Sequence, residues 1–138
     1  MARNTVLGPQ LWVCTPGLDA FCAPSEWSLV APNNVGDGQL SQFNSLGNQT
    51  IGLLAASATT LFIGFNNPAG VQIFKTTAAV PASRTDFTGT AGCVAGSAGC
   101  QGLGTDGLGA PAVNRQIFDA RVMTFALSSW LYLVTEMA

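Results

Sequence analysis

The chain has no histidine and very few charged residues of either sign. Its 138 residues include five lysines and arginines and seven acidic residues, so only 9% are charged, whereas a typical soluble domain is about 25% charged. Without histidine, a serine or cysteine nucleophile lacks its usual general base, and the acidic residues are dispersed along the chain. We therefore expect a protein that is not an enzyme and that holds no cofactor.

The few basic residues also argue against a nucleic-acid partner. Arg3, Lys75, Arg84, Arg115 and Arg121 are scattered without a cluster, and the net charge is −2. Affinity for nucleic acids comes mostly from basic side chains that neutralise phosphates. We therefore expect no binding to DNA or RNA.

Long uninterrupted apolar runs are missing as well. The passage 50–77 has Lys75 as its only charge, but serine, threonine and glycine interrupt it, and a membrane-spanning helix needs about 20 mostly apolar residues. No apolar segment of the kind found in a secretory signal follows Met1. We expect neither a membrane span nor an export signal.

Four cysteines form two close pairs, Cys14 with Cys22 and Cys93 with Cys100. Local pairing within each pair is the simplest of the three possible connectivities, and disulfides between subunits are the alternative. A zinc site is not expected, because the sequence has neither histidine nor a C-x-x-C spacing. We predict no metal site.

The clearest local signal is a β-hairpin between Leu61 and Lys75. Apolar residues alternate up to Phe65, a turn cluster follows at 66–70, and a second β-rich run covers 71–75. This arrangement is typical of two antiparallel strands joined by a loop of four or five residues. Gly70 can take the positive φ that the exit of such a loop requires.

The remaining chain reads as further strands and turns in one domain, residues 1–138. Further strands are expected at 25–30, 49–56 and 59–65, with the odd-numbered apolar residues from Ile51 to Phe65 on one face. The segment 1–13 reads as an extended arm, and 82–112 as a long glycine-rich loop. Strands at such intervals predict an all-β fold, namely a sandwich, a jelly roll or a small barrel with extended termini.

The C-terminal segment is strongly apolar and admits two interpretations. Alternation favours two strands, 116–127 and 130–137, joined at Ser128-Ser129, and a helix is the alternative. Large apolar residues near both ends of the chain are candidates for contacts between subunits, since aromatic residues commonly anchor interfaces. These interface candidates are Leu11, Trp12, Trp27, Trp130 and Tyr132.

Two short motifs match known patterns. The run 102–107 matches G-x-G-x-x-G, but the small residues before it and Pro111 after it do not suit the strand and helix that a dinucleotide site needs. Asn48-Gln49-Thr50 matches the acceptor sequence for N-glycosylation. We interpret the first as a loop and expect no glycosylation at the second, because no export signal accompanies it.

The low charge bears most directly on function. Only twelve charged residues, five basic and seven acidic, are available for the surface of the whole domain. Either uncharged polar residues therefore cover the surface, or neighbouring subunits cover much of it. We favour the second explanation. In its Met start, its low charge, its composition rich in Gly, Ala, Thr and Asn and its extended ends, the chain resembles small capsid-decorating or minor coat proteins of tailed phages.

This resemblance implies a structural virion protein that stabilises a shell through subunit contacts. It implies self-association, with a trimer favoured, contacts with other shell proteins, and assembly of the virion in the host cytoplasm. Disulfides would then form when the particle meets an oxidising exterior. The alternatives are a self-assembling surface filament or adhesin subunit, and a glycan-binding β module.

Overall fold

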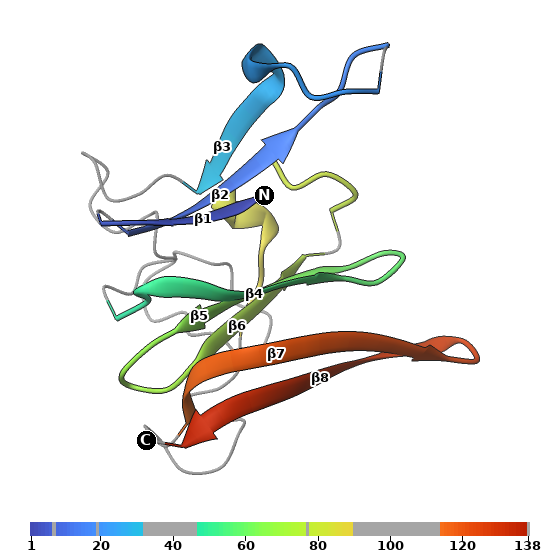
Figure 1. The fold of residues 1–138 in the computed structure, drawn as a ribbon. Coiled ribbons are helices and arrows are strands. Elements are labelled where there is room, and N and C mark those ends of the chain that lie inside the picture. The colour runs from blue at the N-terminus through green and yellow to red at the C-terminus, as the bar shows by residue number, and fades with distance from the viewer. Residues whose placement is uncertain (7, 19, 32–46, 77, 90–113, 138) are drawn as a thin grey trace.

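Eight strands in three antiparallel sheets make up the described part of the chain (Figure 1). The structure is a computed structural model that describes residues 1–6, 8–18, 20–31, 47–76, 78–89 and 114–137. The strands are β1 (Ala2–Thr5), β2 (Gly8–Cys14), β3 (Trp27–Ala31), β4 (Thr50–Ala56), β5 (Leu61–Asn66), β6 (Gln72–Thr76), β7 (Asn114–Phe125) and β8 (Ser128–Met137). The prediction of an all-β fold is confirmed. The described strands do not close into a barrel, because they form separate sheets in the orders β1-β2-β3, β4-β5-β6 and β7-β8.

The segment 1–13, expected as an extended arm, forms most of the first sheet. β1 pairs with β2, and β2 pairs with β3. Pro9 lies in the central strand β2, opposite Asn4 of β1, while the pairing of β2 with β3 starts only at Leu11. Proline is tolerated here because the N–H group that it lacks would point toward β3, and β3 does not pair with β2 at this position.

The middle sheet confirms the predicted hairpin and is buried on both faces. β5 pairs with β6, with Phe65 opposite Gln72, and Gly70 has a φ of 112° in the connecting loop. β4 and β5 are separate strands with a bulge between Ile51 and Leu53. The bulge reverses the alternation, so Leu53 faces the opposite side from Phe65, and the prediction that the odd residues share one face is wrong for Leu53.

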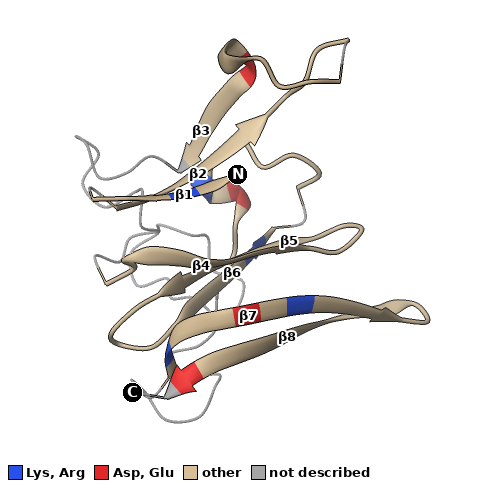
Figure 2. Cartoon of the chain, in the orientation of Figure 1, with Lys and Arg blue, Asp and Glu red and all other residues tan. Residues whose placement is uncertain are grey.

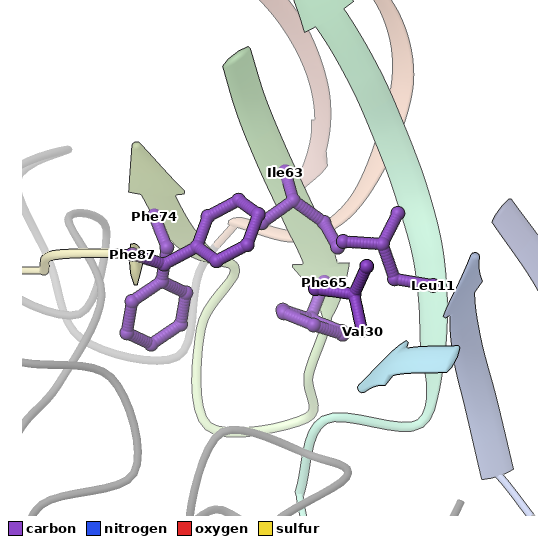
Figure 3. Packing of buried hydrophobic residues seen from close by; sticks show 6 residues of the cluster. All are labelled: Leu11, Val30, Ile63, Phe65, Phe74 and Phe87. Atoms are coloured by element: carbon purple, nitrogen blue, oxygen red, sulfur yellow. The ribbon is translucent and has the colours of Figure 1, made fainter. Parts of the chain in front are cut away.

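The first core cluster fills the space between the first sheet and the middle sheet. Figure 3 shows its six buried members, which come from four strands and from the segment after β6: Leu11, Val30, Ile63, Phe65, Phe74 and Phe87. The rings of Phe65 and Phe74 meet edge to face, with centroids 6.1 Å apart. Phe87 follows the short helix η3 (Arg84–Asp86), so its burial ties the start of the predicted loop 82–112 to the core. Residues 90–112 of that loop lie outside the described part.

The second core cluster joins the middle sheet to the β7–β8 hairpin. Its buried members are Leu53, Val71, Ile73 and Ile117. Gly64 of β5 lies on this side, where it leaves room for Ile117 of β7 and for Leu53. The middle sheet therefore separates two apolar layers, which explains why its strands lack polar residues at alternate positions.

The C-terminal segment forms one long hairpin, as the strand interpretation predicted. Its turn is two residues earlier than expected, at Ala126 and Leu127, so Ser128 and Ser129 belong to β8. Ala126 has a φ of 53°, a value that favours glycine or asparagine in turns. Serine has a stronger preference for turns than alanine or leucine has, so the prediction from the sequence placed the turn at Ser128-Ser129.

Candidate functional site

The β7–β8 hairpin has two apolar faces, and among the described residues only one of them packs against the middle sheet. On the inner face, Ala120 opposes Leu133 and Val122 opposes Leu131. Ala120, Leu131 and Leu133 pack against the second core cluster. The residues between them point to the outer face. Successive residues of both strands therefore alternate between the core side and the surface side.

The base of the hairpin is held by Asn66 at the end of β5 and by the loop between β5 and β6. The side-chain Oδ1 atom of Asn66 accepts a hydrogen bond from the main-chain N–H of Ile117 at 2.8 Å, and its Nδ2 atom donates to Thr50 Oγ1 at 3.0 Å. The main-chain N–H of Asn67 donates to the carbonyl of Arg115 at 3.1 Å, and that of Val71 donates to the carbonyl of Asn114 at 2.8 Å. These bonds determine which face of β7 turns inward.

The outer face is defined here as Met123, Phe125, Trp130, Tyr132 and Val134. The exposed fractions of these residues are 44%, 55%, 58%, 51% and 58% in that order. Met123 lies directly opposite Trp130 on the neighbouring strand, so the two large side chains are adjacent. The outer face is therefore a contiguous apolar surface on a regular strand pair.

Charge on this hairpin is sparse and nearly balanced. Asp119 and Arg121 lie on the same side as the outer face, opposite Val134 and Tyr132. The Arg121 Nε atom is 3.5 Å from Asp119 Oδ2, with both side chains more than half exposed. Figure 2 shows how few charged residues interrupt the two strands. An exposed pair of this kind adds little stability, but it leaves the outer face without net charge.

The structure separates the five interface residues expected from the sequence. Trp130 and Tyr132 lie on the outer face, whereas Leu11 is 3% exposed and belongs to the first core cluster. Leu11 is thus corrected from an interface residue to a core residue. Trp12 and Trp27 are partly buried. Met123, Phe125 and Val134 share the outer face with Trp130 and Tyr132 but were not named individually as interface candidates, although their alternation along the two strands could have identified them.

Trp12 and Trp27 line an apolar cleft of about 300 Å³ where the first sheet meets the middle sheet. Its other lining residues are Met1, Leu11, Val13, Cys14, Val30, Leu54, Leu61 and Pro81. The Met1 amino group donates a hydrogen bond to the carbonyl of Trp12 at 2.7 Å, and burial lowers the pKa of this amine. Among the described residues, the side chains that line the cleft are mostly apolar.

A disulfide joins Cys14 and Cys22, with 6.1 Å between their Cα atoms. The local pairing predicted for these two cysteines is confirmed. The closed loop presents Leu18 and Phe21 to solvent, with exposed fractions of 110% and 77%. Cys93 and Cys100 lie outside the described residues, so their pairing stays a prediction.

The acceptor asparagine of the glycosylation sequence is not accessible in the folded protein. Asn48 is fully buried. Its Nδ2 atom donates to Gln72 Oε1 at 3.2 Å, and its Oδ1 atom accepts from Asn67 Nδ2 at 2.8 Å. This side chain therefore has a structural role, since a buried amide must have its hydrogen bonds satisfied.

No candidate metal site is found among the described residues. They contain no group of three or more Cys, Asp or Glu side chains that could hold a metal ion. No helix among them is long and apolar enough to cross a membrane. No family model, curated protein or solved structure matches the chain. The outer face of β7–β8, where five large apolar residues are about half exposed, is the candidate functional surface.

Proposed function

We propose that this protein is a structural subunit of a virion shell, acting as a capsid-decorating or minor coat protein that stabilises the shell through subunit contacts. The observation that carries the proposal is the outer face of the β7–β8 hairpin, where five large apolar residues are about half exposed. In this proposal the outer face lies against neighbouring copies of the same chain. The resemblance in composition to phage shell proteins supports a shell as the particular assembly.

The size of the outer face supports a stable contact. Large aromatic side chains present 150–250 Å² each when fully exposed, so five half-exposed apolar residues leave roughly 500 Å² of apolar surface open. A standard interface buries about 800 Å² per partner, of which about 60% is apolar. The outer face thus supplies about the apolar area that one such interface needs.

The alternatives have less support. A glycan-binding module would use Trp12 and Trp27, but the described lining of the cleft beside them is mostly apolar and offers few polar groups to bond sugar hydroxyls. A filament subunit would use an extended terminus to complete a neighbour's sheet, whereas β1 at the N-terminus pairs with β2 of the same chain. A sandwich or jelly-roll architecture of the whole domain remains a proposal, which the layered sheets support.

The test is the solution mass of the purified protein, measured by light scattering at native concentration without reductant. We expect an oligomer, followed by closed particles or sheets in electron microscopy when other shell components are present. Trp130→Asp should lower the mass, because it places a charge in the centre of the outer face. The matched control is Val80→Asp, at a residue with a similar exposed fraction of 59% that lies outside the hairpin, and it should leave the mass unchanged. A wild-type protein that stays monomeric would contradict the proposal.

A further inference from the structure

The free edge of β8 is the feature that this inference uses. Among the described residues, β8 has β7 as its only neighbour in the sheet. The strand is ten residues long, and Glu136 is its only charged residue. Natural proteins usually protect an edge strand with lysine, proline, a bulge or short length. Between Ser128 and Val134, β8 has none of these devices.

We propose that β8 pairs with β8 of a second copy, antiparallel and across a two-fold axis perpendicular to the sheet. The two hairpins would then form one four-stranded sheet in the order β7-β8-β8-β7. This inference rests on the proposed function in one respect, namely that the chain assembles with itself. It adds which edge makes the contact, and in which register.

The turn of the hairpin determines which main-chain groups are available. A two-residue turn places Phe125 and Ser128 as the pair that closes the hairpin, and such a pair exchanges both of its hydrogen bonds. The N–H and C=O groups then alternate, so those of Trp130 and Tyr132 point toward β7. Those of Ser129, Leu131 and Leu133 point to the free edge and can bond a second strand.

Symmetry restricts the register of the contact. A two-fold axis perpendicular to the sheet keeps the outer faces of both copies on the same side, so paired residues must both be outer or both be inner. For the regular segment 128–136, full overlap places Tyr132 opposite Tyr132 of the second copy. Leu131 then lies opposite Leu133 of that copy, and these are the residues whose main-chain groups point to the free edge.

The side chains are compatible with this register. On the outer face, Trp130 lies opposite Val134 of the second copy, which makes an apolar cross-strand pair. Glu136 lies opposite Ser128 of the second copy, so the two Glu136 carboxylates are kept apart. The two outer faces become one surface of about twice the area, which stays available for face-to-face packing on further subunits.

This contact is two-fold, whereas the sequence favoured a trimer. An isologous contact joins identical surfaces and closes after two copies. A three-fold contact in the same shell would therefore have to use another surface of the subunit. The edge of β8 and the outer face thus have separate roles, the first in making a dimer and the second in packing dimers together.

Cysteine cross-linking tests the register directly. Side chains come closest at pairs without hydrogen bonds between them, and Tyr132 would be such a pair with its copy. Under mild oxidation, Tyr132→Cys should form covalent dimers, detected by mass spectrometry against the wild-type background. Val134→Cys is the matched control, because it is on the same strand and face with similar exposure and should not link to itself. A mixture of Trp130→Cys and Val134→Cys chains should cross-link to each other.

The outcomes separate this inference from the proposed function. Tyr132→Cys dimers together with the mixed Trp130→Cys and Val134→Cys dimer would support the contact. If the protein is oligomeric but Tyr132→Cys forms no covalent dimer, β8 pairing is overturned and the proposed shell function still stands. If Val134→Cys chains link to one another as readily as Tyr132→Cys chains do, the register is overturned. A monomer at all concentrations would overturn both. As a second measurement, the amide hydrogens of Leu131 and Leu133 should exchange more slowly in the oligomer than in the same protein diluted until it dissociates.

Discussion

Gly64 of β5 lies directly against Ile117 of β7. A Cβ atom added to Gly64 would lie 2.6 Å from the Cδ1 atom of Ile117 and 2.9 Å from the Cβ atom of Leu53. Both distances are shorter than carbon atoms tolerate, and Leu53 is itself held in β4. The position therefore needs glycine so that the hairpin can approach the middle sheet.

Gly64→Ala should destabilise the fold by about 1–3 kcal/mol, the usual cost of overpacking a core. Urea unfolding followed by fluorescence measures the change. Gly17→Ala is the control, because Gly17 is exposed and no positive φ is found there, and it should change the unfolding free energy by less than about 0.5 kcal/mol. Equal stability of the Gly64→Ala variant and the wild type would contradict the packing described here.

Asn66→Ala should loosen the hairpin at its base. The substitution leaves the N–H of Ile117 without its side-chain acceptor, which costs about 1–2 kcal/mol for a partly buried group. Amide hydrogen exchange should speed up at Ile117 and at its neighbours in β7.

Asn4→Ala is the reciprocal control for this experiment. Asn4 accepts a hydrogen bond from the N–H of Ile51 at 2.7 Å and donates to its carbonyl at 3.1 Å. It therefore links the first sheet to the middle sheet as Asn66 links the middle sheet to the hairpin. Asn4→Ala should speed exchange at Ile51 and leave Ile117 unchanged. The same exchange pattern in both variants would argue against separate links.

Removal of the Cys14–Cys22 disulfide should lower stability without changing the strands. A disulfide that closes a loop of about nine residues stabilises by about 2–3 kcal/mol in the chain-entropy estimate. The double variant Cys14→Ser with Cys22→Ser should therefore unfold at lower urea concentration than the oxidised wild type. Circular dichroism should show that the strand content is retained. If the variant is as stable as the oxidised wild type, the bond has no stabilising role.

Two phenylalanines should differ sharply in their effect on stability. Phe87 is fully buried and Phe118 is 65% exposed. Phe87→Ala removes a side chain from the first core cluster and should cost about 3–5 kcal/mol. Phe118→Ala makes the same chemical change on the surface and should cost less than about 0.5 kcal/mol. Thermal unfolding of the two variants compares them, and a similar loss in both would show that burial does not determine the difference.

The local features of the fold could be predicted from the sequence because their causes are local. Alternation and a turn cluster at 66–70 predicted the β5–β6 hairpin, and close spacing predicted the Cys14–Cys22 disulfide. Strand pairs at the C-terminus were also predicted, but the turn at Ala126 was missed because its residues have no turn preference. The bulge beside Gly52 was missed for a related reason, since a single inserted residue has no signature in the apolar pattern.

The candidate surface was decided by the tertiary structure. Both faces of β7–β8 are apolar, so the two-residue period shows that they alternate without showing which one is covered. Contact of Ile117 with Gly64 and the hydrogen bond from the Ile117 N–H to Asn66 accompany an arrangement in which Leu131 faces inward and Trp130 is exposed. Leu11 and Trp130 are both large apolar residues in strands, yet one is in the core and the other on the surface. The sequence by itself determined where the strands are and how apolar they are, and only the packing of three sheets decided which of these apolar residues remain available to a partner.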